Sequence, residues 1–115
     1  MTHNEILNMP AGREMDALIA EKIFGNFVHR LSGGKYGIGS LMLEIPNYST
    51  DIADAWEVAE KLHKENDIFD VWHEKDTGFD WWCEVVNNGG GWSANAKNAP
   101  LAICRAALLA VMEAE

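Results

Sequence analysis

The stretch from Asn98 to Met112 is apolar at almost every position. Asn98 is a favourable N-cap residue, and Pro100 suits the first turn of a helix, where its missing N–H is not needed. Arg105 is the one charged residue of this stretch. A helix that is apolar on nearly all sides must be covered on several of them. We therefore expect this helix either in the core of the fold or at a subunit interface.

Two earlier segments show the spacing of helices with one apolar side. The first begins near Pro10 and ends at Gly25, a residue suited to stop a helix. The second follows Ser49 or Thr50 and carries acids in its first turn, where the helix dipole favours them. The glycine-rich stretch between these helices is expected to be mostly loop, with a short strand at Leu41–Ile45. The predicted inward stripe of the second helix consists of Ile52, Ala55, Trp56, Ala59, Leu62 and His63.

After Asn66 the pattern changes to an alternation with period two, which predicts strands at Ile68–Glu74 and Phe79–Val86. One face of this hairpin is apolar and is expected to contact the second helix: Phe69, Val71, His73, Phe79, Trp81, Cys83 and Val85. The other face carries two tryptophans between pairs of opposed acids: Trp72 with Trp82, Asp70 with Glu84, and Glu74 with Asp80. Opposed like charges are destabilising. A third strand after the glycine turn is expected to add Trp92 to this tryptophan face.

These elements predict a single α+β domain over residues 1–115, with three main helices and an antiparallel sheet of three or four strands. With 48% hydrophobic residues the chain can bury a core without a metal or a disulfide. Cys83 and Cys104 lie in apolar segments, which indicates reduced thiols and a cytoplasmic protein. The closing helix is too short to span a bilayer and the N-terminus does not resemble a signal peptide, so we expect no membrane partner.

The net charge of −9 is concentrated in the middle of the chain. Between Asp51 and Glu84, eleven acids stand against three lysines. Such a surface repels DNA and RNA, so a nucleic-acid partner is not expected. The acids could simply keep the protein soluble, or they could form a face that binds a basic partner.

Three segments resemble a known family of small phage proteins, the phage ABA sandwich domain. They are Ala11–Gly25, Tyr48–Trp56 and Ala99–Leu108, and together with the tryptophan strands they cover most of the chain. The resemblance implies a phage or prophage origin and an α-β-α layered sandwich. It brings no catalytic residues. The chain differs from the family between residues 26 and 46, where it is short and rich in glycine.

Two features could hold a ligand. The loop around Gly33, Gly34, Lys35 and Tyr36 could bind a phosphate through backbone N–H groups, or it could be no more than the tip of a hairpin. The face predicted for Trp72, Trp82 and Trp92 could stack a nucleobase or a sugar, or it could be covered by the closing helix.

Arg105 needs a partner because it is a lone charge on an apolar helix. That partner would be an acid of the same fold or an anionic ligand. The four histidines and two cysteines share no spacing typical of metal ligands, so we expect neither a metal nor a cofactor.

Two functions are therefore predicted for a protein that is not expected to be an enzyme. The first is a binding protein that sequesters a small nucleotide ligand, plausibly a nucleotide-derived signal of host immunity. The second is an acidic interaction module that binds a basic host or phage protein. A homo-oligomer is expected in either case.

Overall fold

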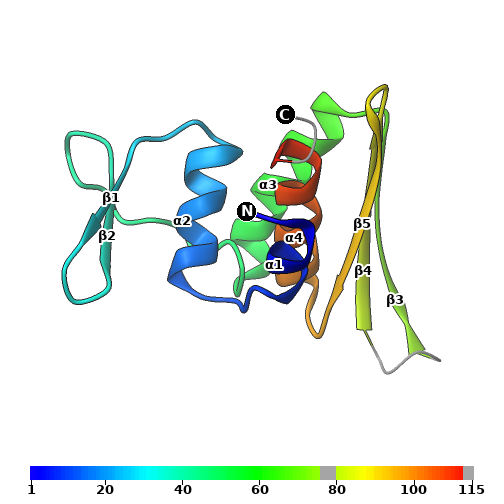
Figure 1. Ribbon diagram of the computed structural model, residues 1–115, viewed down its shortest axis with the longest axis horizontal. Coiled ribbons are helices and arrows are strands. Elements are labelled where there is room, and N and C mark those ends of the chain that lie inside the picture. The colour runs from blue at the N-terminus through cyan, green and yellow to red at the C-terminus, as the bar shows by residue number, and fades with distance from the viewer. Residues whose placement is uncertain (76–79, 113–115) are drawn as a thin grey trace.

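Two antiparallel sheets lie at opposite ends of the long axis of the protein, with the helices between them (Figure 1). The computed structural model describes residues 1–75 and 80–112. In this part of the chain the helices are α1 (His3–Asn8), α2 (Arg13–Lys22), α3 (Ile52–Glu65) and α4 (Ala99–Met112). The strands are β1 (Val28–Leu31), β2 (Lys35–Ile38), β3 (Ile68–Glu74), β4 (Asp80–Asn87) and β5 (Gly90–Ala96).

Of the predicted helix ends, the N-cap at Asn98 is confirmed and the others lie one to three residues away. The side chain of Asn98 accepts a hydrogen bond from the N–H of Leu101, as an N-cap residue does. α3 begins one or two residues later than predicted, because Asp51 is its N-cap and accepts from the N–H groups of Ala53 and Asp54. α2 begins at Arg13 and ends at Lys22 with Ile23 as its C-cap, so it is shorter than the predicted helix from Pro10 to Gly25; Gly25, with a left-handed φ of 69°, lies two residues beyond the cap.

The apolar helix α4 forms the core of the protein. It contacts three helices, α1, α2 and α3, and two strands of the larger sheet, β4 and β5. From Leu101 to Ala110 its residues are buried, apart from the half-buried Arg105. The chain therefore covers α4 by itself. The apolar character of this helix no longer requires a subunit interface, and the homo-oligomer stays a prediction.

The larger sheet has the strand order β3-β4-β5, and the predicted register of its first two strands is confirmed. Trp72 lies opposite Trp82, with the acid pairs Asp70–Glu84 and Glu74–Asp80 on either side. Phe79, which we placed at the start of the second strand, lies outside the described residues.

The predicted α+β class with an antiparallel sheet and three main helices is confirmed, and the short helix α1 is an unpredicted addition. In the described residues the helices cover one face of the larger sheet, which we call the inner face (Figure 1). We call the opposite face the outer face.

Three local predictions were wrong. The short strand expected at Leu41–Ile45 is only an isolated bridge between Leu43 and Ile38, while the hairpin β1–β2 forms just before it. The buried stripe of α3 is Ala55, Val58, Ala59 and Leu62, and the predicted members Ile52, Trp56 and His63 are exposed. This stripe fits beside α4, so the bulky Trp56 is turned outward. Trp92 lies on the inner face, as described below.

A buried polar junction joins two of the segments that resemble the phage family. Asp16 of α2 is 1% exposed, and one of its carboxylate oxygens accepts from both the N–H and the hydroxyl of Ser49 at 2.8 and 2.7 Å. Its other oxygen accepts from Arg13 at 2.9 Å. The Ser49 hydroxyl also accepts from the N–H of Gly12 at 3.0 Å. This network fixes the start of α2 against the chain that leads into α3.

Candidate functional site

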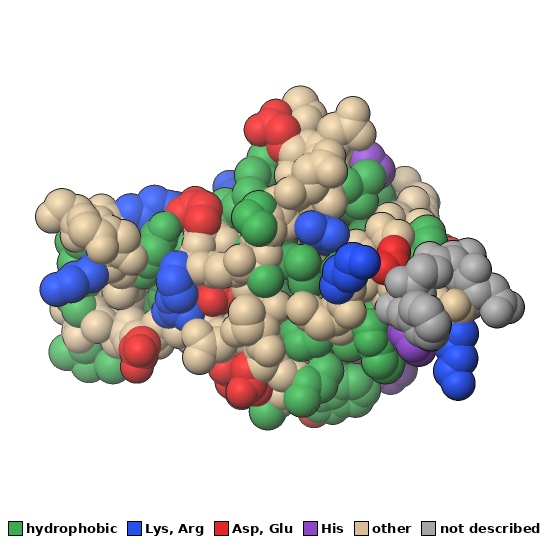
Figure 2. Space-filling view, turned by 90° about the horizontal axis from the view of Figure 1, so that it is seen from below, with side chains coloured by type: hydrophobic (Ala, Val, Ile, Leu, Met, Phe, Trp, Pro, Cys, Tyr) green, Lys and Arg blue, Asp and Glu red, His purple; other side chains and the backbone are tan. Residues whose placement is uncertain are grey.

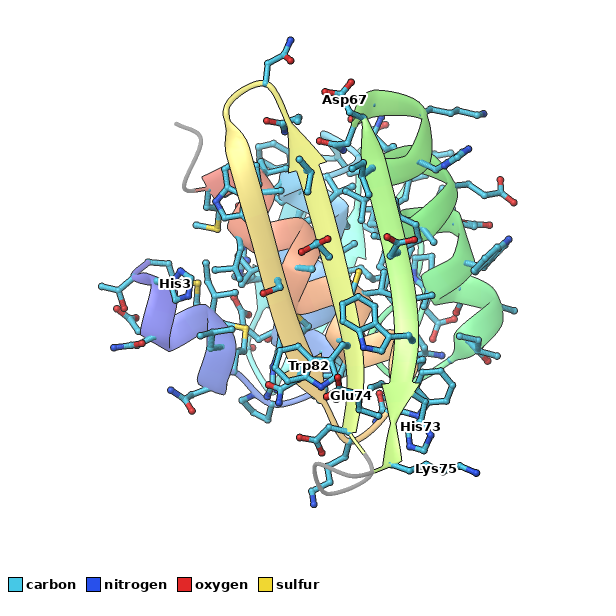
Figure 3. All side chains as sticks on the ribbon, turned by 90° about the vertical axis from the view of Figure 1, so that its right-hand side faces the viewer. His3, Asp67, His73, Glu74, Lys75 and Trp82 are labelled. Carbon is cyan, nitrogen blue, oxygen red and sulfur yellow. The ribbon has the colours of Figure 1, made fainter. Side chains whose placement is uncertain are left out.

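The outer face of the larger sheet carries the tryptophans and acids that the sequence singled out. Figure 3 looks onto this face, with the labelled Trp82 projecting from β4. The rings of Trp72 and Trp82 are nearly parallel, at 11°, with their centroids 6.3 Å apart. Trp72 is 36% exposed, so its ring is available to solvent. The two tryptophans form an aromatic surface on the one face of this sheet that the described helices leave open.

The indole N–H of Trp82 is buried and, among the described residues, has no hydrogen-bond partner. An unsatisfied buried N–H costs about 1–3 kcal/mol. Stacking against Trp72 therefore helps to hold this ring in place, and a hydrogen bond from its N–H to a described residue does not.

Four carboxylates surround the tryptophan pair on the same face. Asp70 lies directly opposite Glu84, and Glu74 lies directly opposite Asp80. The amide of Asn95 donates to Asp80 at 3.0 Å. Opposed carboxylates on neighbouring strands repel each other. The Asp70–Glu84 pair beside the exposed ring of Trp72 therefore costs the sheet some stability.

An apolar groove lies beside this face, between α3 and β3. Its volume is about 270 Å³ and it is lined by Trp56, Ala59, Glu60 and His63 of α3 and by Phe69 of β3. Trp56, at the mouth of this groove, is 50% exposed. The sequence analysis missed the groove because it placed Trp56 and His63 in the core. The signal that could have found it is the width of the α3 stripe, which has more large apolar residues than one neighbouring helix can cover.

The glycine loop is the tip of the hairpin β1–β2, at the far end of the molecule from the tryptophans (Figure 1). Gly33 and Gly34 have φ values of 78° and 73°, which allow the tight turn that leads into Lys35. Seen from below, hydrophobic and basic side chains lie together on the surface at this end of the molecule (Figure 2). Whatever the hairpin tip binds, it cannot share a small ligand with the outer face.

Tyr36 and Arg30 anchor the hairpin to α2. The Tyr36 hydroxyl donates to Glu14 at 2.9 Å, and the guanidinium of Arg30 donates to Glu14 at 3.0 Å and to Glu21 at 3.1 Å. Partial burial alone would raise the pKa of Glu14, but the hydrogen bonds from Arg30 and Tyr36 outweigh it and lower the pKa. Tyr36, predicted to bind a ligand, thus makes a contact that holds the fold together.

Trp92 and Arg105 lie away from the outer face. The prediction that Trp92 joins Trp72 and Trp82 is wrong, because Trp92 pairs with Val85 and therefore shares the inner face. The tight turn that pairs Asn87 with Gly90 sets this register.

Among residues 1–75 and 80–112, Arg105 forms no ion pair with an acid. Its guanidinium donates to the backbone carbonyl of Met9 at 2.8 and 3.2 Å and to that of Asn95 at 2.8 Å. These bonds connect α4 to the segment after α1 and to the end of β5. The observed partners of Arg105 are therefore structural.

The two thiols are poor nucleophiles. Cys83 and Cys104 are free and buried. Burial raises the pKa of Cys83 to about 12 and also raises that of Cys104. In the described part of the chain, no group of three or more His, Cys, Asp or Glu side chains is placed to hold a metal ion. No helix of that part is long and apolar enough to span a membrane.

Comparison with known proteins agrees with this architecture. The sequence profile of the phage ABA sandwich domain matches residues 17–108. The chain belongs to the phage ABA sandwich family. The match spans the hairpin, α3, the whole larger sheet and most of α4 of this phage ABA sandwich protein. Both the aromatic surface and the groove are therefore inside the family domain.

A solved structure also resembles this phage ABA sandwich protein. It is a phage protein from Bacillus cereus ATCC 14579, whose crystal structure was determined at 2.0 Å. It is 36% identical, the match covers 88% of this chain and 92% of that chain, and the TM-score is 0.70. A comparison with curated proteins finds no match.

Proposed function

We propose that this phage protein is a non-enzymatic binding protein whose outer sheet face recognises a basic segment of another protein. One observation carries the proposal: a stacked pair of tryptophans, Trp72 and Trp82, lies between two pairs of opposed carboxylates. A lysine or arginine placed over an indole ring gains about 0.5–2 kcal/mol. The same cation would relieve the repulsion between Asp70 and Glu84. A basic partner would thus place a cation over the indole rings and beside Asp70 and Glu84 at once.

A second copy of the protein fits this face poorly. A symmetric face-to-face dimer would bring the four carboxylates of one copy against those of the other. The chain as a whole carries −9, which adds to the repulsion between copies. The charge of the face therefore favours a partner of opposite sign.

The test is a calorimetric titration with the capped peptide Lys-Thr-Lys-Leu-Lys-Thr-Lys at low and at moderate salt. We expect Glu84→Gln to weaken binding three- to fivefold and added salt to weaken it further. The matched control is Glu57→Gln, which removes the same charge from α3. Equal weakening by the two variants would reduce the effect to net charge and overturn the proposal.

Glu84→Gln also offers a readout of folding. Because it removes one of two opposed carboxylates, we expect the variant to be as stable as the parent protein or slightly more stable. A loss of binding together with an unchanged or raised melting temperature cannot be attributed to misfolding.

Sequestration of a nucleotide-derived host signal is the second candidate, and the exposed ring of Trp72 favours it as a stacking surface. A base held between the two rings would need them about 7 Å apart, twice the carbon contact distance of 3.5 Å. Since the centroids are 6.3 Å apart, a base would stack on the open side instead. The carboxylates would repel its phosphate, and Lys35 lies at the other end of the molecule.

A thermal-shift panel of mono-, di- and cyclic nucleotides separates the two functions. A rise in melting temperature that Trp72→Ala abolishes would support nucleotide binding. A flat panel, together with binding of the basic peptide, would support the interaction module.

A further inference from the structure

The helical layer is wider than the sheet that it covers. In Figure 3, α3 extends beyond β3, the edge strand of the order β3-β4-β5. The groove of Trp56, Ala59 and Phe69 lies under this overhang. α3 is thus placed as if to cover one more strand on the outer side of β3.

The edge of β3 is poorly protected against pairing. Proteins usually shield an edge strand by making it short or bulged, or with inward-pointing charges. β3 is seven residues long, and the inward side chains along its first half, Phe69 and Val71, are apolar, while the inward His73 lies near its end against Trp81. Among the described residues it pairs with β4 alone. Over Ile68–Trp72, the alternate N–H and C=O groups on its other side are therefore available to a further strand.

We propose that an extended segment of the basic partner adds to the edge of β3 as a fourth strand and places an apolar side chain in the groove. An added strand lies about 4.8 Å from β3, and its side chains alternate between the two faces. Those on the inner side would point toward Trp56 and Ala59. Those on the outer side would lie beside Asp70 and Trp72 and continue the acidic face.

This geometry defines which residues the added segment should carry. The requirement for basic residues rests on the proposed function. Outward positions opposite Asp70 should be lysine or arginine, because opposite charges directly across a strand pair are stabilising. One inward position should be leucine or a similar apolar residue. The groove of about 270 Å³ is smaller than the roughly 300–1,000 Å³ of pockets for whole small molecules, so it suits a side chain.

A second copy of β3 is the competing occupant. Antiparallel pairing of two β3 edges about Val71 would set each Asp70 opposite Trp72 of the other copy. It would also bring the two Asp70 carboxylates onto the same face as diagonal neighbours. In this register no cation of either copy would lie opposite Asp70, so the charge at the centre of the edge favours the basic segment.

The experiment compares four peptides with the parent protein. The first is Lys-Thr-Lys-Leu-Lys-Thr-Lys, in which lysines alternate with uncharged residues. The second, Lys-Lys-Thr-Leu-Thr-Lys-Lys, has the same composition without the alternation. The third and fourth carry N-methyl groups on alternate backbone amides of the first peptide, at either the lysines or the other residues. In an added strand only one of these two sets of amides faces β3.

We expect the alternating peptide to bind at least fivefold more tightly than the scrambled one. One N-methylated peptide should lose at least tenfold, while the other stays within about threefold of the parent. Trp56→Ala should weaken the alternating peptide severalfold. Its matched control is Phe27→Ala, which removes an exposed aromatic ring at the hairpin end.

Equal binding of all four peptides, with Glu84→Gln still weakening each, would overturn strand addition and leave the proposed function intact. Failure of every peptide to bind would overturn both. A dimer that Trp56→Ala dissociates, without peptide binding, would overturn the inference in favour of a second copy.

Discussion

Replacement of Ser49 by alanine tests the buried junction that holds the helical layer together. The hydroxyl donates to Asp16 at 2.7 Å and accepts from the N–H of Gly12 at 3.0 Å. A hydrogen bond to a charged group contributes about 1.5–3 kcal/mol, and an unsatisfied buried N–H costs about 1–3 kcal/mol. Ser49 is fully buried, so water cannot readily replace the lost hydroxyl. We take about 3 kcal/mol as the expected loss in the free energy of unfolding.

This loss of unfolding free energy corresponds to a measurable fall in the melting temperature. For 115 residues, the entropy of unfolding near 60 °C is about 0.24 kcal/mol per kelvin, so 3 kcal/mol lowers the melting temperature by about 12 °C. Calorimetry or circular dichroism would measure it, with the exposed neighbour Thr50→Ala as the control. A shift of Ser49→Ala no larger than that of Thr50→Ala would refute the role of the junction.

Three further predictions concern other polar contacts and the thiols. Arg105→Met should lower the melting temperature by several degrees, because it leaves two backbone carbonyls without their donor, and should keep peptide affinity within about twofold. A selective loss of binding would contradict the structural role of Arg105. The pKa of Glu14 is lowered in the folded state, so its contacts stabilise the fold above the ordinary carboxyl pKa of about 4.3 and lose this effect as the pH falls further. Glu14→Gln should therefore flatten the acid limb of a stability–pH curve by up to about 1 kcal/mol. Cys83 and Cys104 should resist iodoacetamide in the folded protein and react on unfolding, and rapid labelling of the native state would show that burial does not protect them.

The sequence predicted those parts of the fold that depend on local pattern. The alternation in β3 and β4 has a period of two, so parity alone sets Trp72 opposite Trp82 once the two strands pair. The N-cap Asn98 is likewise a local signal. The apolar closing helix showed that it had to be covered on several sides, and the structure identifies what covers it.

The parts that failed depend on how elements meet in space. One step in the turn after Asn87 decides which face Trp92 joins, and the sequence there allowed either register. The orientation of α3 depends on its contact with α4, so Trp56 could not be told from a core residue by spacing. Lys35 and Trp72 are both candidate ligand residues, but only the fold shows that they lie at opposite ends of the molecule. The groove lies between α3 and β3, so its local signal is the width of the α3 stripe, and the position of β3 beside it comes from the fold.

The most direct test of the proposed function is an NMR titration that follows the indole N–H signals of ¹⁵N-labelled protein. The chain has five tryptophans, and they report on different surfaces. When Lys-Thr-Lys-Leu-Lys-Thr-Lys is added, we predict that the signals of Trp72 and Trp82 shift most, with Trp56 following if the strand adds beside β3. The signal of Trp92 on the inner face should stay in place. Shifts confined to Trp92, or to backbone amides around Lys35, with Trp72 and Trp82 unmoved, would contradict a binding site on the outer face.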